Sequence, residues 1–196
     1  MQLVQTALPI EAARQPLLDA IATETGNLIR ERGLARLHFI CTHNSRRSQF
    51  AQAWAAAAAR HFGLPVACFS GGVEVTACNE RTVAALQRAG FEVASDGAAS
   101  NPHYQLSANG ELLATLYSKR YDDAENPDAG FLALMTCSDA DEHCPFIPGA
   151  VQRMPLRYED PKGSDGTEGE AAAYDHCSLL IATEIAYIFN AVKLRV

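Results

Sequence analysis

A short stretch near residue 40 constrains the fold more than any other part of this chain. Phe39 and Ile40 end an apolar run and are followed by Cys41. Six residues after Cys41, Arg47 and Ser48 open a long alanine-rich helical pattern. This order predicts a buried strand, a tight loop and the first turn of a helix. Because backbone N–H groups that curl into a helix start form a nest for a tetrahedral oxyanion, the stretch predicts an anion-binding loop with a cysteine at its base.

Cys41 is the candidate nucleophile of this loop. A thiolate is stabilised by helix N-terminal amides, neighbouring cations and hydroxyl donors, all of which the loop can supply. Asn44 tolerates the left-handed backbone of a tight loop, and Ser48 is placed to donate to the sulfur. The alternative is that Cys41 is a small buried hydrophobe, as most free cysteines are. The expected anion is phosphate or arsenate, and the substrate-binding candidates are Thr42, His43, Asn44, Ser45, Arg46, Arg47 and Ser48, with Arg47 closing over the anion through two hydrogen bonds.

Composition limits the partners of this chain. With 196 residues, 48% of them hydrophobic, one domain with a full core is expected. The net charge of −7 argues against a nucleic-acid surface and favours a small oxyanion as partner. We find no basic start followed by an apolar run and no apolar stretch of about 18 residues, so we expect no signal peptide, no membrane association and a cytoplasmic location. Six cysteines are too few for a secreted disulfide scaffold, and the histidines lack paired ligand spacing, so neither a metal nor another cofactor is expected.

Strand and helix patterns alternate along most of the chain. Residues 1–34 form an amphipathic helical extension, with Pro16 at or near the helix start. Strands are predicted at 37–40, 66–69 and 131–136, and helices at 47–61, 79–89 and 174–192. This alternation predicts an α/β fold over residues 35–196, a single domain with an open parallel sheet and helices on both faces.

Residues 93–130 interrupt this alternation. Asn109 and Gly110 separate two runs at 103–106 and 112–117, which is a strong signal for an inserted β-hairpin. We expect the hairpin to be peripheral. Lys119 and Arg120 follow it and are interpreted as a solvated basic pair, with the alternative that they face the anion site.

The pattern Cys41-x5-Arg47-Ser48, after a strand and before a helix, resembles the low-molecular-weight protein tyrosine phosphatase family and its relatives, the thioredoxin-coupled arsenate reductases. The similarity runs from about residue 37 to the C-terminus, with the insertion in between. The resemblance implies that Asp160, which precedes Pro161, is the general acid that protonates a leaving oxygen. The alternative is an ordinary Asp-Pro turn.

A second cysteine pair carries the more specific part of the resemblance. Cys137 follows the strand at 131–136 and is therefore expected at the same sheet edge as Cys41. The segment from Cys137 to Asp141, with Cys144, looks like the redox segment of thioredoxin-coupled arsenate reductases. The resemblance implies that Cys41 attacks arsenate, that Cys137 attacks the adduct and releases arsenite, and that Cys144 takes over the disulfide with Cys137 for reduction by thioredoxin. The alternative is a core Cys137 and an incidental surface Cys144.

Several positions depart from the family pattern. His43 replaces a small residue, and Arg46 stands where many members have a second loop cysteine. Gln52 replaces the glutamate of potassium-binding arsenate reductases, so bound potassium is not expected. Lys162 stands where phosphatases acting on phosphotyrosine tend to place an aromatic ring.

Three functions remain open on these grounds. The first is an arsenate reductase that uses Cys41, Cys137 and Cys144 with Arg47 and Asp160. The second is a phosphatase that hydrolyses phosphate monoesters through a phosphocysteine at Cys41. The third is a non-catalytic oxyanion or redox sensor that binds the anion without turnover.

Overall fold

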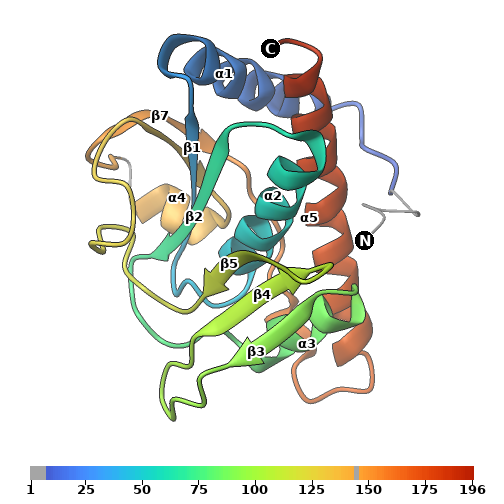
Figure 1. Ribbon diagram of the computed structural model, residues 1–196. Helices are drawn as coiled ribbons and strands as arrows, with labels where there is room; N and C mark the ends of the chain where they lie inside the picture. The colour runs from blue at the N-terminus through green and yellow to red at the C-terminus, as the bar shows by residue number, and fades with distance from the viewer. Residues whose placement is uncertain (1–7, 144–145) are drawn as a thin grey trace.

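The computed structural model describes residues 8–143 and 146–196 (Figure 1). Its helices are α1 Gln15–Arg32, α2 Arg47–Phe62, α3 Glu80–Arg88, α4 Ser138–His143, the 3₁₀ helix η1 Pro161–Ser164 and α5 Glu170–Lys193. Its strands are β1 Ala35–Cys41, β2 Val66–Gly72, β3 Glu92–Ser95, β4 Tyr104–Ala108, β5 Glu111–Leu116, β6 Phe131–Met135 and β7 Ala150–Pro155. No helix in the described part of the chain is both long and apolar enough to cross a membrane.

A four-stranded parallel sheet in the order β2-β1-β6-β7 forms the centre of the fold. The predicted open parallel sheet is therefore confirmed. β1 and β6 are the two inner strands, and Ile40 lies opposite Met135 near their carboxyl ends. Because these two strands are neighbours, the residues that follow them emerge side by side at one edge of the sheet.

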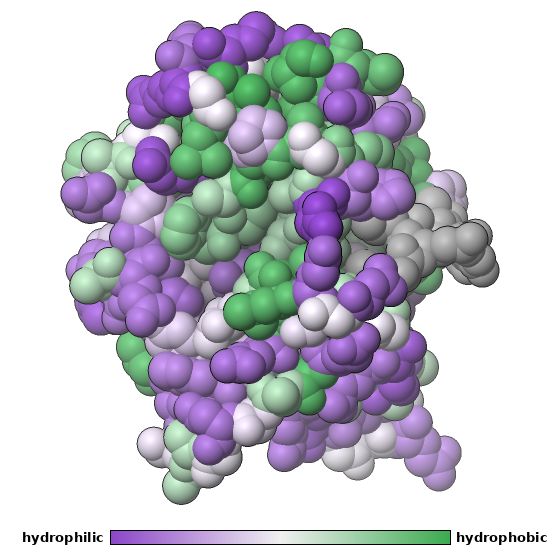
Figure 2. Space-filling view, in the orientation of Figure 1, coloured by the Kyte–Doolittle hydropathy of each residue, from purple (hydrophilic) through white to green (hydrophobic). Residues whose placement is uncertain are grey.

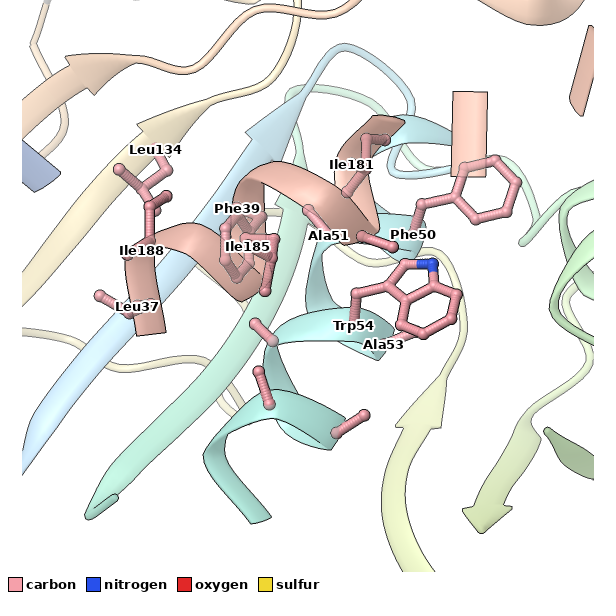
Figure 3. Close-up of a cluster of buried hydrophobic side chains, with 14 of the residues drawn as sticks. Leu37, Phe39, Phe50, Ala51, Ala53, Trp54, Leu134, Ile181, Ile185 and Ile188 are labelled. Carbon is pink, nitrogen blue, oxygen red and sulfur yellow. The ribbon is translucent and has the colours of Figure 1, made fainter. Parts of the chain in front are cut away.

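The two faces of the sheet carry different helices. Helices α1, α2 and α5 pack on one face, where Phe39 of β1 lies beside Ile185 of α5 in an apolar cluster that also contains Trp54 of α2 (Figure 3). Along β1 alternate side chains point to opposite faces, so Ile40 points to the other side. There it joins a smaller apolar cluster covered by α4, with residues Phe131, Ala133, Met135, Cys137, Ala140 and Ile147.

The N-terminal segment forms the predicted helix. α1 has a proline in its first turn, Pro16, where the missing N–H costs no intrahelical bond. It ends at Gly33, whose left-handed φ of 74° caps the last turn. α1 packs against β1 and α5, so it covers the same face of the sheet as α2.

The inserted hairpin is present, but its expected peripheral position is wrong. Asn109 and Gly110 have φ values of 53° and 75°, as a tight two-residue hairpin turn requires, and β3 adds a third antiparallel strand that we did not predict. Leu106 and Leu116 are fully buried, and β5 packs against α2. The hairpin is thus part of the core, although the surface over it is largely hydrophilic (Figure 2).

The interpretation of Lys119 and Arg120 as a solvated pair is correct only for Arg120. Arg120 is exposed and pairs with Asp122 at 2.8 Å. Lys119 is 5% exposed, with its Nζ 4.1 Å from the centroid of the Tyr117 ring. Burial lowers the pKa of the Lys119 ammonium, because the charged form loses its hydration.

Candidate active site

The Cys41 sulfur lies at the base of a closed loop between β1 and α2. Cys41 is 4% exposed and receives a hydrogen bond of 3.2 Å from the backbone N–H of Asn44, whose φ is 47°. The Ser48 hydroxyl lies 3.1 Å from the sulfur. Ser48 Oγ already accepts a bond of 2.9 Å from the Asn44 side chain, so its own hydrogen is available to the sulfur. The loop therefore offers two donors to a thiolate at Cys41.

The inserted hairpin supports this loop from behind. The segment that leaves β5 contributes the backbone N–H of Lys119, which donates to Asn44 Oδ1 at 3.0 Å. Gln49 Nε2 donates to both Asn44 O and Tyr117 O at 2.8 Å. The Ser118 hydroxyl donates to the backbone carbonyl of His43 in the loop at 2.8 Å. These contacts make the insertion a structural part of the anion loop.

Gly72 permits the close approach of β2 to the same loop. A Cβ atom at Gly72 would lie 2.7 Å from both Asn44 N and Thr42 O. Real side chains do not tolerate such contacts with backbone atoms, so a larger residue here would displace the loop.

Arg47 joins the loop to the candidate acid. Its Nη2 donates to Asp160 Oδ2 at 2.6 Å, and its Nη1 donates to Tyr158 O at 3.1 Å. Among the described residues its buried Nε has no hydrogen-bond partner. The other oxygen of Asp160 accepts the backbone N–H of Lys162 at 3.0 Å. Arg47 is thus held at the loop mouth by Asp160 and Tyr158, and its unbonded Nε is available to an anion.

The structure brings Cys137 to the same site. Cys137 lies two residues beyond the end of β6 and is 1% exposed. Its sulfur lies 3.5 Å from the Thr42 hydroxyl and accepts a bond of 3.3 Å from the backbone N–H of Ala140. Thr42 also donates to Asp139 Oδ2 at 2.7 Å. Arg47, Asp160, Cys137 and Asp139 together line a cleft of about 630 Å³.

The segment that carries Cys137 is anchored at one further point. Asp141, whose side chain is 4% exposed, pairs with both Arg153 and Arg157 from β7 and the loop after it. These pairs attach α4 to the neighbouring strand. Cys144, the third predicted cysteine, lies outside the described residues.

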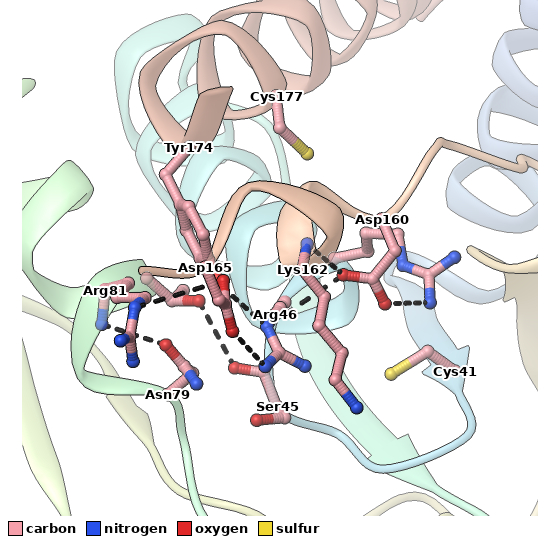
Figure 4. A network of polar contacts seen from close by, with 12 residues as sticks. Cys41, Ser45, Arg46, Asn79, Arg81, Asp160, Lys162, Asp165, Tyr174 and Cys177 are labelled. Carbon is pink, nitrogen blue, oxygen red and sulfur yellow. Dashed lines mark hydrogen bonds and ion pairs between the residues drawn. The ribbon is translucent and has the colours of Figure 1, made fainter. Parts of the chain in front are cut away.

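The remaining loop side chains point away from the cleft. His43 is exposed and lies 3.3 Å from Glu74, and Ser45 donates to Ala77 O at 2.7 Å. Arg46 turns toward Tyr174 and Asp165, as Figure 4 shows. His43, Ser45, Arg46 and Lys162 line a second groove of about 570 Å³ beside the loop.

The other described cysteines are held as thiols. Burial raises the pKa of Cys78 and of Cys177 to about 12, and it also raises that of Cys68.

Gln52 stands where potassium-binding arsenate reductases have a glutamate. Its side-chain oxygen accepts a hydrogen bond of 2.6 Å from Ser70, and its side-chain nitrogen donates to Cys68 O. Within residues 8–143 and 146–196 no group of three or more His, Cys, Asp or Glu side chains is placed to hold a metal ion.

Two features of the site were not assigned a role from the sequence. Asp139 belongs to the segment after Cys137, and its position four residues beyond the end of β6, at the sheet edge that carries the loop, is the signal that could have revealed it. Tyr174 contacts the loop across 128 residues of sequence, and no local pattern could have revealed that contact.

Comparison with known proteins agrees with this geometry. A model of the low molecular weight phosphotyrosine protein phosphatase family matches residues 36–130. The arsenate reductase of Bacillus licheniformis is 30% identical over 138 residues, which is 70% of this chain and 82% of that protein. The arsenate reductase of Bacillus subtilis is 28% identical over 138 residues, with the same shares of each chain. This chain therefore belongs to the low molecular weight phosphotyrosine protein phosphatase family.

Solved structures share the fold. The low molecular weight phosphotyrosine phosphatase of Vibrio cholerae aligns with a TM-score of 0.52 at 15% identity, over 79% of this chain and 93% of that chain. The arsenate reductase of Archaeoglobus fulgidus aligns with a TM-score of 0.52 at 21% identity, over 79% of this chain and 98% of that chain. The two Bacillus relatives are both named arsenate reductases.

Proposed function

We propose that this protein is an arsenate reductase that resolves its arsenic adduct through cysteine chemistry. The observation that carries the proposal is that Cys41 and Cys137 lie in one buried cluster after the ends of adjacent strands, with the hydroxyl of Thr42, the residue next to Cys41, 3.5 Å from the Cys137 sulfur. A hydrolytic site needs one nucleophilic sulfur, whereas reduction of arsenate needs two electrons and hence two sulfurs. The names of the sequence relatives support the same conclusion.

The first step is attack of the Cys41 thiolate on arsenate. Arsenate binds in the loop, where the backbone amides and the free Nε of Arg47 meet its oxygens. A sulfur–arsenic bond forms and one arsenic–oxygen bond breaks. Asp160 is placed to protonate the leaving oxygen, which departs as water. Arsenic remains pentavalent in this adduct.

The second step is attack of Cys137 on the Cys41 sulfur. A sulfur–sulfur bond forms, the sulfur–arsenic bond breaks, and its electron pair stays on arsenic, which leaves as trivalent arsenite. Cys137 must first lose its proton. The Thr42 hydroxyl has one hydrogen, which it gives to Asp139, so it can only accept from the Cys137 thiol. The proton can therefore pass from the Cys137 thiol through the Thr42 hydroxyl to Asp139.

The third step transfers the disulfide outward. The thiolate of Cys144 attacks the Cys137 sulfur, a Cys137–Cys144 disulfide forms, and Cys41 leaves as a thiolate ready for the next arsenate. A dithiol protein of the thioredoxin class then reduces the disulfide. We assign Cys144 to this role from the sequence segment that it shares with Cys137.

A phosphatase is the second candidate because it would use the same loop. Water would attack a phosphocysteine at Cys41, with Asp160 as acid and then base. The groove beside the loop, lined by His43, Arg46 and Lys162, offers about 570 Å³ for the organic part of an ester. Arsenate has no such part, so this groove is the specific observation in favour of the phosphatase.

Substitution of Cys144 separates the two candidates. We expect wild-type protein to oxidise NADPH in the presence of arsenate, thioredoxin and thioredoxin reductase. Cys144→Ser should abolish multiple turnovers of arsenate and leave hydrolysis of para-nitrophenyl phosphate within about twofold. Cys68→Ser, at a partly buried thiol that lines neither the cleft nor the groove, is the matched control and should leave both activities unchanged. Sustained arsenate reduction by Cys144→Ser would refute the relay.

A further inference from the structure

Arg46 is the loop residue whose side chain is most firmly held outside the cleft. Its Nε donates to the Tyr174 hydroxyl at 2.7 Å, and its Nη2 lies 3.4 Å from Asp165 Oδ2. The side chain is 14% exposed. A guanidinium that is buried to this degree and bound on two sides has little freedom to change its rotamer.

Tyr174 is the centre of this arrangement. It is fully buried in α5, and its hydroxyl accepts from Arg46 and donates to Asp165 Oδ1 at 2.8 Å. Burial raises the pKa of Tyr174 to about 12, so the hydroxyl keeps the proton that it donates to Asp165. The Tyr174 hydroxyl therefore connects the anion loop to the segment that follows the candidate acid (Figure 4).

The segment that follows Asp160 is also bound to other helices near its C-terminal end, at residues 166–170. Arg81 of α3 lies 2.7 Å from Glu170 Oε2, and Glu170 accepts the backbone N–H of Gly166 at 2.6 Å. Asp165 lies between these ties and the Tyr174 hydroxyl. Residues 160–170 are therefore fixed at several points to helices that do not belong to the loop itself.

Two arginines approach Asp160, and they differ in how they are held. Arg47 Nη2 lies 2.6 Å from Asp160 Oδ2, and Arg46 Nε lies 3.9 Å from Asp160 Oδ1. Arg47 is the residue that must turn to a bound anion, and its Nε has no partner in the described structure. When Arg47 turns, Asp160 loses its shortest contact. Arg46 cannot follow, because the Tyr174 hydroxyl and Asp165 hold it.

We propose that Tyr174 is a positioning residue for the general acid: together with Asp165 it fixes the Arg46 guanidinium, and this fixed cation keeps Asp160 over the loop after Arg47 has moved to the anion. The inference rests on the proposed function, because Asp160 matters only if a leaving oxygen is protonated there. It also gives a physical role to Arg46.

Tyr174→Phe tests this role with a minimal change. The variant keeps the buried ring and removes only the hydroxyl. We expect kcat to fall about 10- to 100-fold for arsenate, the size of loss that a misplaced catalytic group causes. Inhibition by inorganic phosphate should change less than about twofold, because Tyr174 does not touch the anion loop amides. The control is Tyr187→Phe on the same helix, about 20 Å along the axis, whose hydroxyl contacts Asp19 and whose loss should change neither quantity.

Two further measurements distinguish positioning from a general structural effect. Asp165→Asn should lower kcat in the same direction, and the double variant should lose no more than the worse single one, because both residues act through Arg46. With aryl phosphates, Tyr174→Phe should slow phenyl phosphate more than dinitrophenyl phosphate, since the better leaving group needs no proton.

Each result has a defined meaning. An unchanged kcat in Tyr174→Phe, or a parallel loss of kcat and phosphate affinity, would overturn the role of Tyr174. The proposed function would still stand in either case, provided that the wild-type protein reduces arsenate. Wild-type protein that turns over neither arsenate nor aryl phosphates would overturn the proposed function, and the inference with it.

Discussion

Thr42→Val is the sharpest test of how Cys137 is activated. The substitution keeps the shape of the side chain and removes the hydroxyl that lies 3.5 Å from Cys137 Sγ and 2.7 Å from Asp139 Oδ2. A hydrogen bond to a charged group contributes about 1.5–3 kcal/mol, and about 1.4 kcal/mol corresponds to a tenfold change in rate. Attack by Cys137 should therefore slow about 10- to 100-fold, and kcat for arsenate should fall by that factor where this step is rate-limiting.

The assay compares two reactions in one protein. Arsenate turnover is measured as NADPH oxidation with thioredoxin and thioredoxin reductase, and para-nitrophenyl phosphate hydrolysis is measured beside it. Hydrolysis should change less than about twofold, since the Thr42 hydroxyl is directed to the second cysteine rather than to the phosphocysteine step. Thr23→Val, at an exposed threonine of α1 whose hydroxyl donates to Asp19 O, is the matched control. Equal losses of both activities in Thr42→Val, or no loss of arsenate turnover, would refute the assigned role.

Two predictions concern the scaffold. His38 is fully buried, and burial lowers its pKa from 6.5 to about 3, so below pH 6.5 the unfolded chain binds a proton that the folded chain does not. Between pH 6.5 and 4.5 this should lower the free energy of unfolding by about 2.3 kcal/mol. Urea titrations of His38→Leu should lack this pH-dependent loss, and an equal pH dependence in both proteins would contradict the prediction. Ser118→Ala removes a hydroxyl that donates to His43 O and accepts from Thr76 N, and should lower the free energy of unfolding by about 1–3 kcal/mol. It should also weaken phosphate inhibition, and unchanged inhibition would show that the insertion does not support the loop.

The parts of the fold that could be predicted are those that short stretches of sequence specify by themselves. The apolar run before Cys41 and the helical spacing after Arg47 specify a strand, a loop and a helix within a dozen residues. The parallel order of such units then brings Cys137 to the same edge as Cys41, which the structure shows on adjacent strands. Asn109-Gly110 likewise marks its hairpin locally, because both residues need a positive φ.

The parts that could not be predicted depend on tertiary contacts. Nothing in the sequence of the hairpin shows that Lys119 N and Ser118 Oγ will meet a loop 75 residues earlier. The placement of Lys119 as a buried cation over Tyr117, rather than a solvated one, follows from that docking. The bond between Arg46 and Tyr174 is likewise set by how α5 packs on α2.

The central claim is that sulfur, not water, resolves the adduct at Cys41. It is tested most directly by adding arsenate to reduced Cys144→Ser protein without thioredoxin, followed by non-reducing peptide mapping and arsenite measurement. The account predicts a disulfide between Cys41 and Cys137 and one arsenite released per chain. Release of arsenite without that disulfide, or no arsenite at all, would contradict it.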